Sequence, residues 1–139
     1  MATSTSFRIS AEARRGLAAR AEQEGLSATS LLEQLILEGV AARDHPGIVH
    51  RGPATDRRAA LAAGPDVWEV IVRLKELDGP EETRVRTLSD ETDLHPHLIR
   101  IAIDYAAGHP DEVEARIARH HAGQRRSREA AAQRARLLA

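Results

Sequence analysis

The chain has 139 residues, no cysteine, a formal net charge of −1, and one residue each of Phe, Trp and Tyr. Its length suits one medium domain or two small ones, and so few large side chains favour small cores that dimerisation completes. The lack of cysteine excludes disulfides and thiolate zinc sites, and without a signal peptide or a long apolar run we expect a cytoplasmic protein.

Near the N-terminus, the apolar Phe7 and Ile9 alternate with polar side chains. An extended segment over residues 4–9 places Phe7 and Ile9 on one face and the polar side chains on the other. The polar residues are Ser4, Ser6 and Arg8. A lone strand must pair its backbone groups, and no second strand lies nearby in the sequence. The simplest partner is therefore the same strand of a second molecule.

Two helices with clear capping signals follow this leader. Ser10 stands at the N-cap of a helix predicted from Ala11 to Glu24, which ends at Gly25. Ser27 stands at the N-cap of a second helix, predicted over residues 28–42. The second helix carries a wide apolar stripe of Leu31, Leu32, Leu35, Ile36 and Val40.

The order of strand, helix, turn and helix resembles the ribbon-helix-helix family, the Arc, MetJ and CopG type of DNA-binding domain. The matching residues are Ser6-Phe7-Arg8-Ile9-Ser10, Leu17, Ala21, and Gly25-Leu26-Ser27-Ala28-Thr29-Ser30-Leu31-Leu32. The resemblance implies a dimer whose two strands form an antiparallel ribbon in the major groove of DNA. Its core would consist of Phe7, Ile9, Leu17, Leu31, Leu35 and Ile36.

Two sets of DNA contacts follow from this arrangement. Base contacts are expected from Ser4, Ser6 and Arg8, of which Arg8 can form two hydrogen bonds to guanine. Phosphate contacts are expected at the start of the second helix, where backbone N–H groups and hydroxyls are available. The residues there are Ser27, Ala28, Thr29 and Ser30. The alternative is a helical hairpin after a disordered leader, with Arg8 solvated and Ser27 acting only as a helix cap.

Glycine and proline residues divide the rest of the chain into short elements. Residues 48–50 and 58–61 fit either two extended pieces or an irregular loop. The expected helices cover residues 66–77, 81–92 and 97–107, followed by a last helix that Asp111 caps. The helices over 81–92 and 97–107, joined by a short turn, form a helix-turn-helix-like pair.

Residues 46–119 resemble the DUF433 family. The matching segments are Pro46-Gly47-Ile48-Val49, Thr55-Asp56-Arg57-Arg58, Ile101-Ala102-Ile103-Asp104-Tyr105-Ala106 and His109-Pro110-Asp111-Glu112-Val113. The front half departs from the family, because Gly52-Pro53-Ala54-Thr55-Asp56 replaces its usual glycine-rich entry. The resemblance implies a helical, helix-turn-helix-like domain and an antitoxin that pairs with a PIN-like ribonuclease.

Three roles stay open for this second block: an extra DNA contact, an oligomerisation unit, or a surface for a partner protein. If it contacts DNA, Arg57 and Arg58 are candidates for phosphate contacts, whereas His97 and Arg100 lie where a recognition helix would begin. A packing unit with an exposed polar face explains the same residues.

The last segment, residues 119–139, has six arginines and a single acid, Glu129. We expect it to be either helical or disordered, and to order when it meets an acidic partner. The antitoxin resemblance implies that an arginine enters the carboxylate cluster of the nuclease. The candidates are Arg125, Arg126, Arg128, Arg134 and Arg136.

No nucleophile–base pair, phosphate loop or persuasive carboxylate pair is present, so we do not expect an enzyme, and no cofactor is expected. His95–His97 and His120–His121 lack the spacing that joins two imidazoles on one helical face, so we expect no metal site. The sequence predicts a mostly α fold with three parts: a ribbon-helix-helix domain (1–44), a helical domain (45–118) and a basic tail (119–139).

The predicted function is that of a dimeric, DNA-binding antitoxin of a type II toxin–antitoxin system, which represses its own operon and neutralises a PIN-like ribonuclease. Two alternatives stay open. The first is a stand-alone ribbon-helix-helix regulator or nucleoid-associated protein. The second is a protein-interaction module that uses the ribbon only to dimerise.

Overall fold

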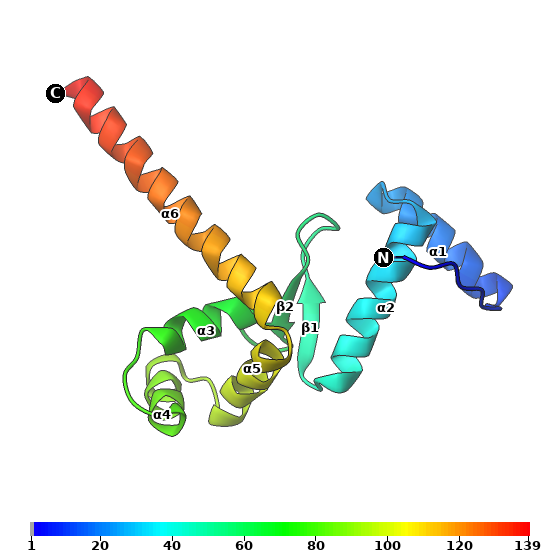
Figure 1. The fold of residues 1–139 in the computed structure, drawn as a ribbon, viewed down its shortest axis with the longest axis horizontal. Coiled ribbons are helices and arrows are strands. Elements are labelled where there is room, and N and C mark those ends of the chain that lie inside the picture. The colour runs from blue at the N-terminus through cyan, green and yellow to red at the C-terminus, as the bar shows by residue number, and fades with distance from the viewer. Residues whose placement is uncertain (1) are drawn as a thin grey trace.

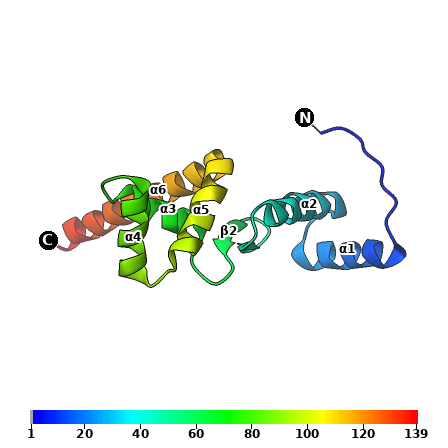
Figure 2. The ribbon, with the colours of Figure 1, turned by 90° about the horizontal axis from the view of Figure 1, so that it is seen from below.

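The computed structural model describes residues 2–139, which form a mostly helical fold with one two-stranded antiparallel sheet (Figure 1). The elements are α1 (Ala11–Glu24), α2 (Ala28–Asp44), β1 (Ile48–Arg51), β2 (Arg58–Leu61), α3 (Val67–Lys75), α4 (Glu81–Thr92), α5 (Pro96–Gly108) and α6 (Pro110–Leu138). This confirms the mostly helical fold class. The helix pair α1–α2 lies on one side of the molecule, and α6 projects away on another (Figures 1 and 2).

The helices α1 and α2 form a hairpin, as their capping residues predict. This hairpin and residues 2–10 together are called the head below. The hydroxyl of Ser10 accepts a hydrogen bond from the Ala13 N–H at 3.0 Å, and that of Ser27 accepts one from the Ser30 N–H at 3.1 Å. Gly25 ends α1 in the left-handed conformation with φ 68°, which glycine adopts without steric cost. Between the two helices, Ala21 and Leu31 are buried.

Residues 2–10 form neither helix nor strand within the single chain. They leave the start of α1 as an irregular segment that curves away from the two helices (Figure 2), and Phe7 is 80% exposed. A strand needs a hydrogen-bonded partner strand, and the expected partner belongs to a second chain. The predicted strand over residues 4–9 therefore stays a prediction.

The small sheet resolves the choice that the sequence left open for residues 48–50 and 58–61. Both are extended, and β1 pairs with β2 in antiparallel register from Ile48 opposite Leu61 to Arg51 opposite Arg58. Gly52 begins the connecting turn with φ 105°, and a Cβ atom there would lie 2.2 Å from the backbone oxygen of Asp56. Only glycine fits this turn without a backbone shift.

The body of the molecule consists of β1, β2, α3, α4, α5 and the start of α6, packed around one apolar core. The fully buried side chains include Leu61, Val67, Leu88, Ile99 and Tyr105. The core also includes Ala41 from the last turns of α2. The head is thus joined to the body by a continuous helix, because α2 packs on β1 at one end and on α1 at the other.

Three helices start one or two residues from their predicted positions: α3 at Val67, α5 at Pro96 and α6 at Pro110. Helix α6 begins at Pro110 with His109 at the N-cap, so the predicted cap residue Asp111 lies in the first turn and is not the cap. Proline at the first helical position fixes this start, because its ring sets φ and its missing N–H needs no acceptor. At α3, Asp66 stands at the N-cap without capping the helix, because its carboxylate binds other side chains.

Helix α6 is 29 residues long and continues to Leu138. Of the two states expected for residues 119–139, the structure shows the helical one. Only the start of the helix is anchored, with Val113 and Ile117 in the core. Residues 124–139 are all exposed.

Candidate nucleic-acid interface

Most of the large exposed apolar side chains lie in the head. Phe7 and Ile9 in the leader are exposed, as are Leu35, Ile36 and Leu37 on α2. Leu32 and Val40 belong to the same exposed set. An apolar surface of this extent on a small unit marks a site of association.

The predicted dimer core divides into two groups. Leu31 is buried and Leu17 is half-buried within the single chain, so these two residues belong to the hairpin between α1 and α2. The other four members, Phe7, Ile9, Leu35 and Ile36, are exposed. These four are therefore available to a second chain.

The three predicted base-reading residues, Ser4, Ser6 and Arg8, are exposed. Within residues 2–139 their side chains form no hydrogen bond or ion pair. An arginine that keeps its five donors available can bind both acceptors of a guanine edge. The leader therefore presents Arg8 without an internal partner to displace.

The start of α2 is also open. Ser27, Ala28, Thr29 and Ser30 are exposed, and the Ser27 hydroxyl accepts from the Ser30 N–H while it donates to the Ser30 hydroxyl at 2.9 Å. The N–H groups of Ala28 and Thr29 lie in the first turn, where a helix provides no acceptor. The capping role of Ser27 is thus confirmed, and two backbone donors remain for an anion.

Arg57 is held inside the protein. Its guanidinium donates to the two carboxylate oxygens of Glu38 at 3.1 and 2.6 Å, and to the backbone oxygen of His50 at 3.2 Å. The hydrogen bonds to Glu38 raise the pKa of Arg57. Because Glu38 lies on α2, this ion pair joins the head to the turn between β1 and β2.

Arg58 is at the centre of a second arginine–carboxylate network. It donates to Asp66 at 2.7 Å and to Asp56 at 3.1 Å. Asp66 is 7% exposed and also accepts from the Trp68 indole at 3.2 Å. Burial of a carboxylate is costly unless its oxygens have such hydrogen-bond and ion-pair partners. Both Arg57 and Arg58, proposed as phosphate contacts, are therefore already paired with acids.

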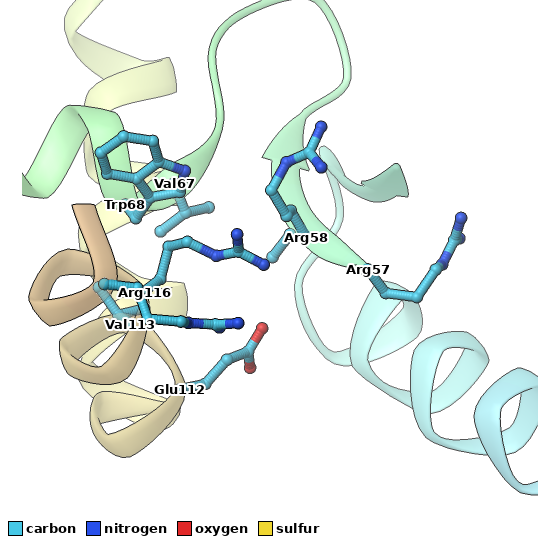
Figure 3. Close-up of a pocket in the computed structure, with 9 residues that line it drawn as sticks. Arg57, Arg58, Val67, Trp68, Glu112, Val113 and Arg116 are labelled. Carbon is cyan, nitrogen blue, oxygen red and sulfur yellow. The ribbon is translucent and has the colours of Figure 1, made fainter. Parts of the chain in front are cut away.

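The same network reaches α6 through Asp56. Arg116 on α6 forms an ion pair with Asp56, and this hydrogen bond is the main cause that lowers the pKa of Asp56. The side chains around it come from β2, α3 and α6, and they surround a small cavity (Figure 3). The cavity of about 40 Å³ has room for water but not for a substrate of ordinary size.

The second pair of possible DNA contacts lies on α5. His97 and Arg100 are both exposed, and Arg100 pairs with Glu82 of α4 at 3.1 Å. The neighbouring His95 caps α5, since its Nδ1 atom accepts from the His97 N–H at 3.0 Å. The structure thus places both residues at the surface, but it uses Arg100 to join α4 and α5.

One cluster had no signal in the sequence. Three histidines from two distant segments gather around Tyr105: His109 stacks on its ring at 4.2 Å, and the His45 and His50 rings approach it edge-on. The Tyr105 hydroxyl donates to Glu112 at 2.8 Å, and burial raises the pKa of Tyr105. His45 ends α2, His50 lies on β1 and His109 precedes α6, so the cluster brings these three elements together with α5.

The predicted toxin-binding arginines all lie on the exposed part of α6: Arg125, Arg126, Arg128, Arg134 and Arg136. Within residues 2–139, no three His, Asp or Glu side chains come together in an arrangement that would bind a metal ion. Over the same range, none of the helices has the length and apolar composition that crossing a bilayer requires. No protein-family model matches this chain, and searches of curated proteins and of solved structures give no significant match.

Proposed function

We propose that this chain is a homodimeric DNA-binding repressor of the ribbon-helix-helix kind. The observation that carries the proposal is the exposure of Phe7 and of the α2 apolar face in a chain whose body buries its own apolar residues. Pairing of two leaders satisfies their backbone groups and buries Phe7 and Ile9 of each copy. Each such side chain contributes about 1.5–3 kcal/mol when it is fully buried.

The proposed ribbon turns its other face outward. Alternation places Ser4, Ser6 and Arg8 of both copies on that face, and a two-stranded ribbon fits the major groove. The open N-termini of the two α2 helices bind phosphates on either side and fix the register. A dimer bound in this way at its own promoter blocks transcription of its operon.

The dimer is tested by changing Phe7→Ser and, as the matched control, Leu137→Ser. The two side chains are 80% and 82% exposed in the single chain, so their removal changes monomer surface to the same degree. Sedimentation velocity over a concentration series should show weaker dimerisation for Phe7→Ser only. Equal behaviour of the two variants would place the dimer interface elsewhere.

DNA reading is tested with Arg8→Ala. This change should weaken binding to the promoter of the protein's own operon more than binding to a random duplex, because base contacts specify whereas phosphate contacts only position. The expected loss of discrimination is about 1–3 kcal/mol for each base contact. Equal losses on both duplexes contradict base reading, and no salt-dependent binding at all contradicts the proposed function.

An antitoxin role is the second candidate function. It rests on the resemblance of residues 46–119 and is favoured by the exposed, basic half of α6, which an acidic nuclease surface can attract. The test is co-purification with the product of a neighbouring nuclease gene. Removal of residues 119–139 should abolish that complex if these arginines hold the nuclease.

A further inference from the structure

The second half of α6 leaves the body. His120 of α6 still lies against the body, with its ring 4.8 Å from that of Trp68 on α3. Beyond it the helix continues to Leu138 as a free arm (Figures 1 and 2). Residues 119–138, called the arm below, begin beside the body at Arg119 and His120 and extend about 30 Å at the rise of an α-helix.

The arm is a helix for reasons that are local. Val113 and Ile117 anchor the first turns of α6 in the core, so the costly nucleation step is already made by packing. Alanine, arginine, glutamine and leucine then continue the helix, since all have high helix propensity. The arm therefore needs no packing partner to be helical, and its side chains remain available.

Its charge is strongly one-sided. The arm has six arginines, with Glu129 as its single acid. Within residues 2–139, none of the six forms an ion pair. They are Arg119, Arg125, Arg126, Arg128, Arg134 and Arg136. In the body, by contrast, Arg57, Arg58 and Arg116 are each bound to a carboxylate. The arm is thus positioned to bind an external anion.

The spacing of these arginines indicates what kind of anion. Arg119, Arg126 and Arg134 follow one another at intervals of seven and eight residues, which places them on one face of the helix. Arg125, Arg128 and Arg136, at intervals of three and eight, fall on another face that lies nearly opposite. We call these faces the first and second stripes.

A carboxylate cluster on a protein lies to one side of a docked helix, so it can use one stripe only. The major groove of DNA is about 12 Å wide and admits a helix of about 10–12 Å, with phosphates along both walls. A helix in this groove brings cations on both sides close to phosphate. Two stripes on opposite faces therefore match a duplex better than they match an acidic pocket.

We propose that the arm binds duplex DNA as a helix in a groove, with each arginine stripe on one phosphate wall. This inference extends the proposed DNA-binding function to a second site, separate from the leader and the start of α2. The arm contributes affinity without sequence choice, because phosphate contacts are the same for every sequence.

The experiment measures the affinity of the full-length protein for a random-sequence 30-base-pair duplex by fluorescence anisotropy over a series of salt concentrations. One variant removes part of the first stripe (Arg126→Ala with Arg134→Ala), and another removes part of the second (Arg125→Ala with Arg128→Ala). Alanine preserves the helix, which circular dichroism verifies. The matched control removes two body arginines, Arg73→Ala with Arg86→Ala, so that the net charge changes equally.

Each stripe variant should reduce the slope of log affinity against log salt by about two for every arm that engages the duplex, and the control should leave it unchanged. Three results overturn the proposal: an equal loss in the control, an effect of one stripe only, or competition by polyglutamate as effective as that by DNA. The second and third results indicate an acidic protein surface as the partner of the arm.

The Arg8→Ala variant separates this proposal from the function of the head. If the arm binds DNA and the leader does not, the stripe variants lose affinity for every duplex, whereas Arg8→Ala has no effect on promoter discrimination. If the leader reads DNA and the arm does not, Arg8→Ala loses discrimination and the stripe variants keep the salt slope of the unchanged protein.

Discussion

The body and the two parts that project from it, the head and the arm, use the same residue types in opposite ways. In the body, Arg58 binds two carboxylates and Ile99 is fully buried. In the head, Arg8 is without a partner in the described chain and Ile36 is half exposed. These body residues have partners within the chain, whereas Arg8 and Ile36 remain available to other molecules.

This contrast explains how a chain with few aromatic residues forms a packed body. The body relies on small aliphatic side chains and on arginine–carboxylate pairs that tie β2, α3 and α6 together. The head has one buried pair of side chains, Ala21 and Leu31, between its helices. A unit with so small a core gains stability from association, as the proposed dimer provides.

The largest effect is expected from the same substitution at two isoleucines. Ile99→Ala creates a cavity in the core and should lower the free energy of unfolding by about 2–5 kcal/mol. Ile36→Ala removes an exposed side chain, so the monomer should lose little, but thermal unfolding should depend more strongly on protein concentration. Denaturant titration measures the loss for Ile99→Ala, and thermal unfolding at two protein concentrations measures the effect of Ile36→Ala. Equal losses at the two positions would remove the distinction between body and head.

The next prediction is that a glycine-to-alanine substitution changes stability in opposite directions in the body and in the head. Gly52→Ala forces a Cβ atom into the hairpin turn at positive φ and should destabilise the protein by about 1–3 kcal/mol. Gly16→Ala in α1 meets no atom within 4 Å and should stabilise its helix by about 0.5–1 kcal/mol. Melting temperatures of the two variants test this. A stabilised Gly52→Ala variant would be incompatible with the turn described above.

The smallest expected effect is on the stability of the fold at low pH. Because the ion pair with Arg116 lowers the pKa of Asp56, that carboxylate stabilises the fold above its unfolded pKa near 3.8, and this stability is lost as the pH falls through the lowered value. Asp56→Asn should therefore reduce the steepness of the acid limb in a plot of melting temperature against pH. The control Glu129→Gln, on the arm, should leave the curve unchanged. A curve that responds to both changes alike would mean that Asp56 gains nothing from its partners.

The local features of the fold were predictable from the sequence. The caps at Ser10 and Ser27, the left-handed Gly25 and the apolar periodicity of the helices depend on residues only a few positions apart. The β-hairpin stayed undecided, because strands as short as β1 and β2 depend on tertiary contacts more than on their own propensity. The start of α6 was predicted two residues too late, since the fixed φ of Pro110 outweighed the capping preference of Asp111.

The candidate site also contains features that the sequence indicates and features that depend on distant residues. Arg8 and the start of α2 are exposed, and the DNA contacts predicted for them stay predictions. The roles of Arg57, Arg58 and Arg100 were not readable, because their partners Glu38, Asp66 and Glu82 lie 8 to 19 residues away in the sequence. A charged side chain looks the same in a sequence whether it is paired or free.

The order of residues alone determined the caps of α1 and α2 and the apolar faces of the helices, since hydrogen bonds and rotamer preferences act over one or two turns. Only the tertiary structure decided which arginines are bound to carboxylates and which project on α6, and how the histidines collect around Tyr105. These outcomes depend on distances between segments far apart in the chain, and packing of the core sets those distances.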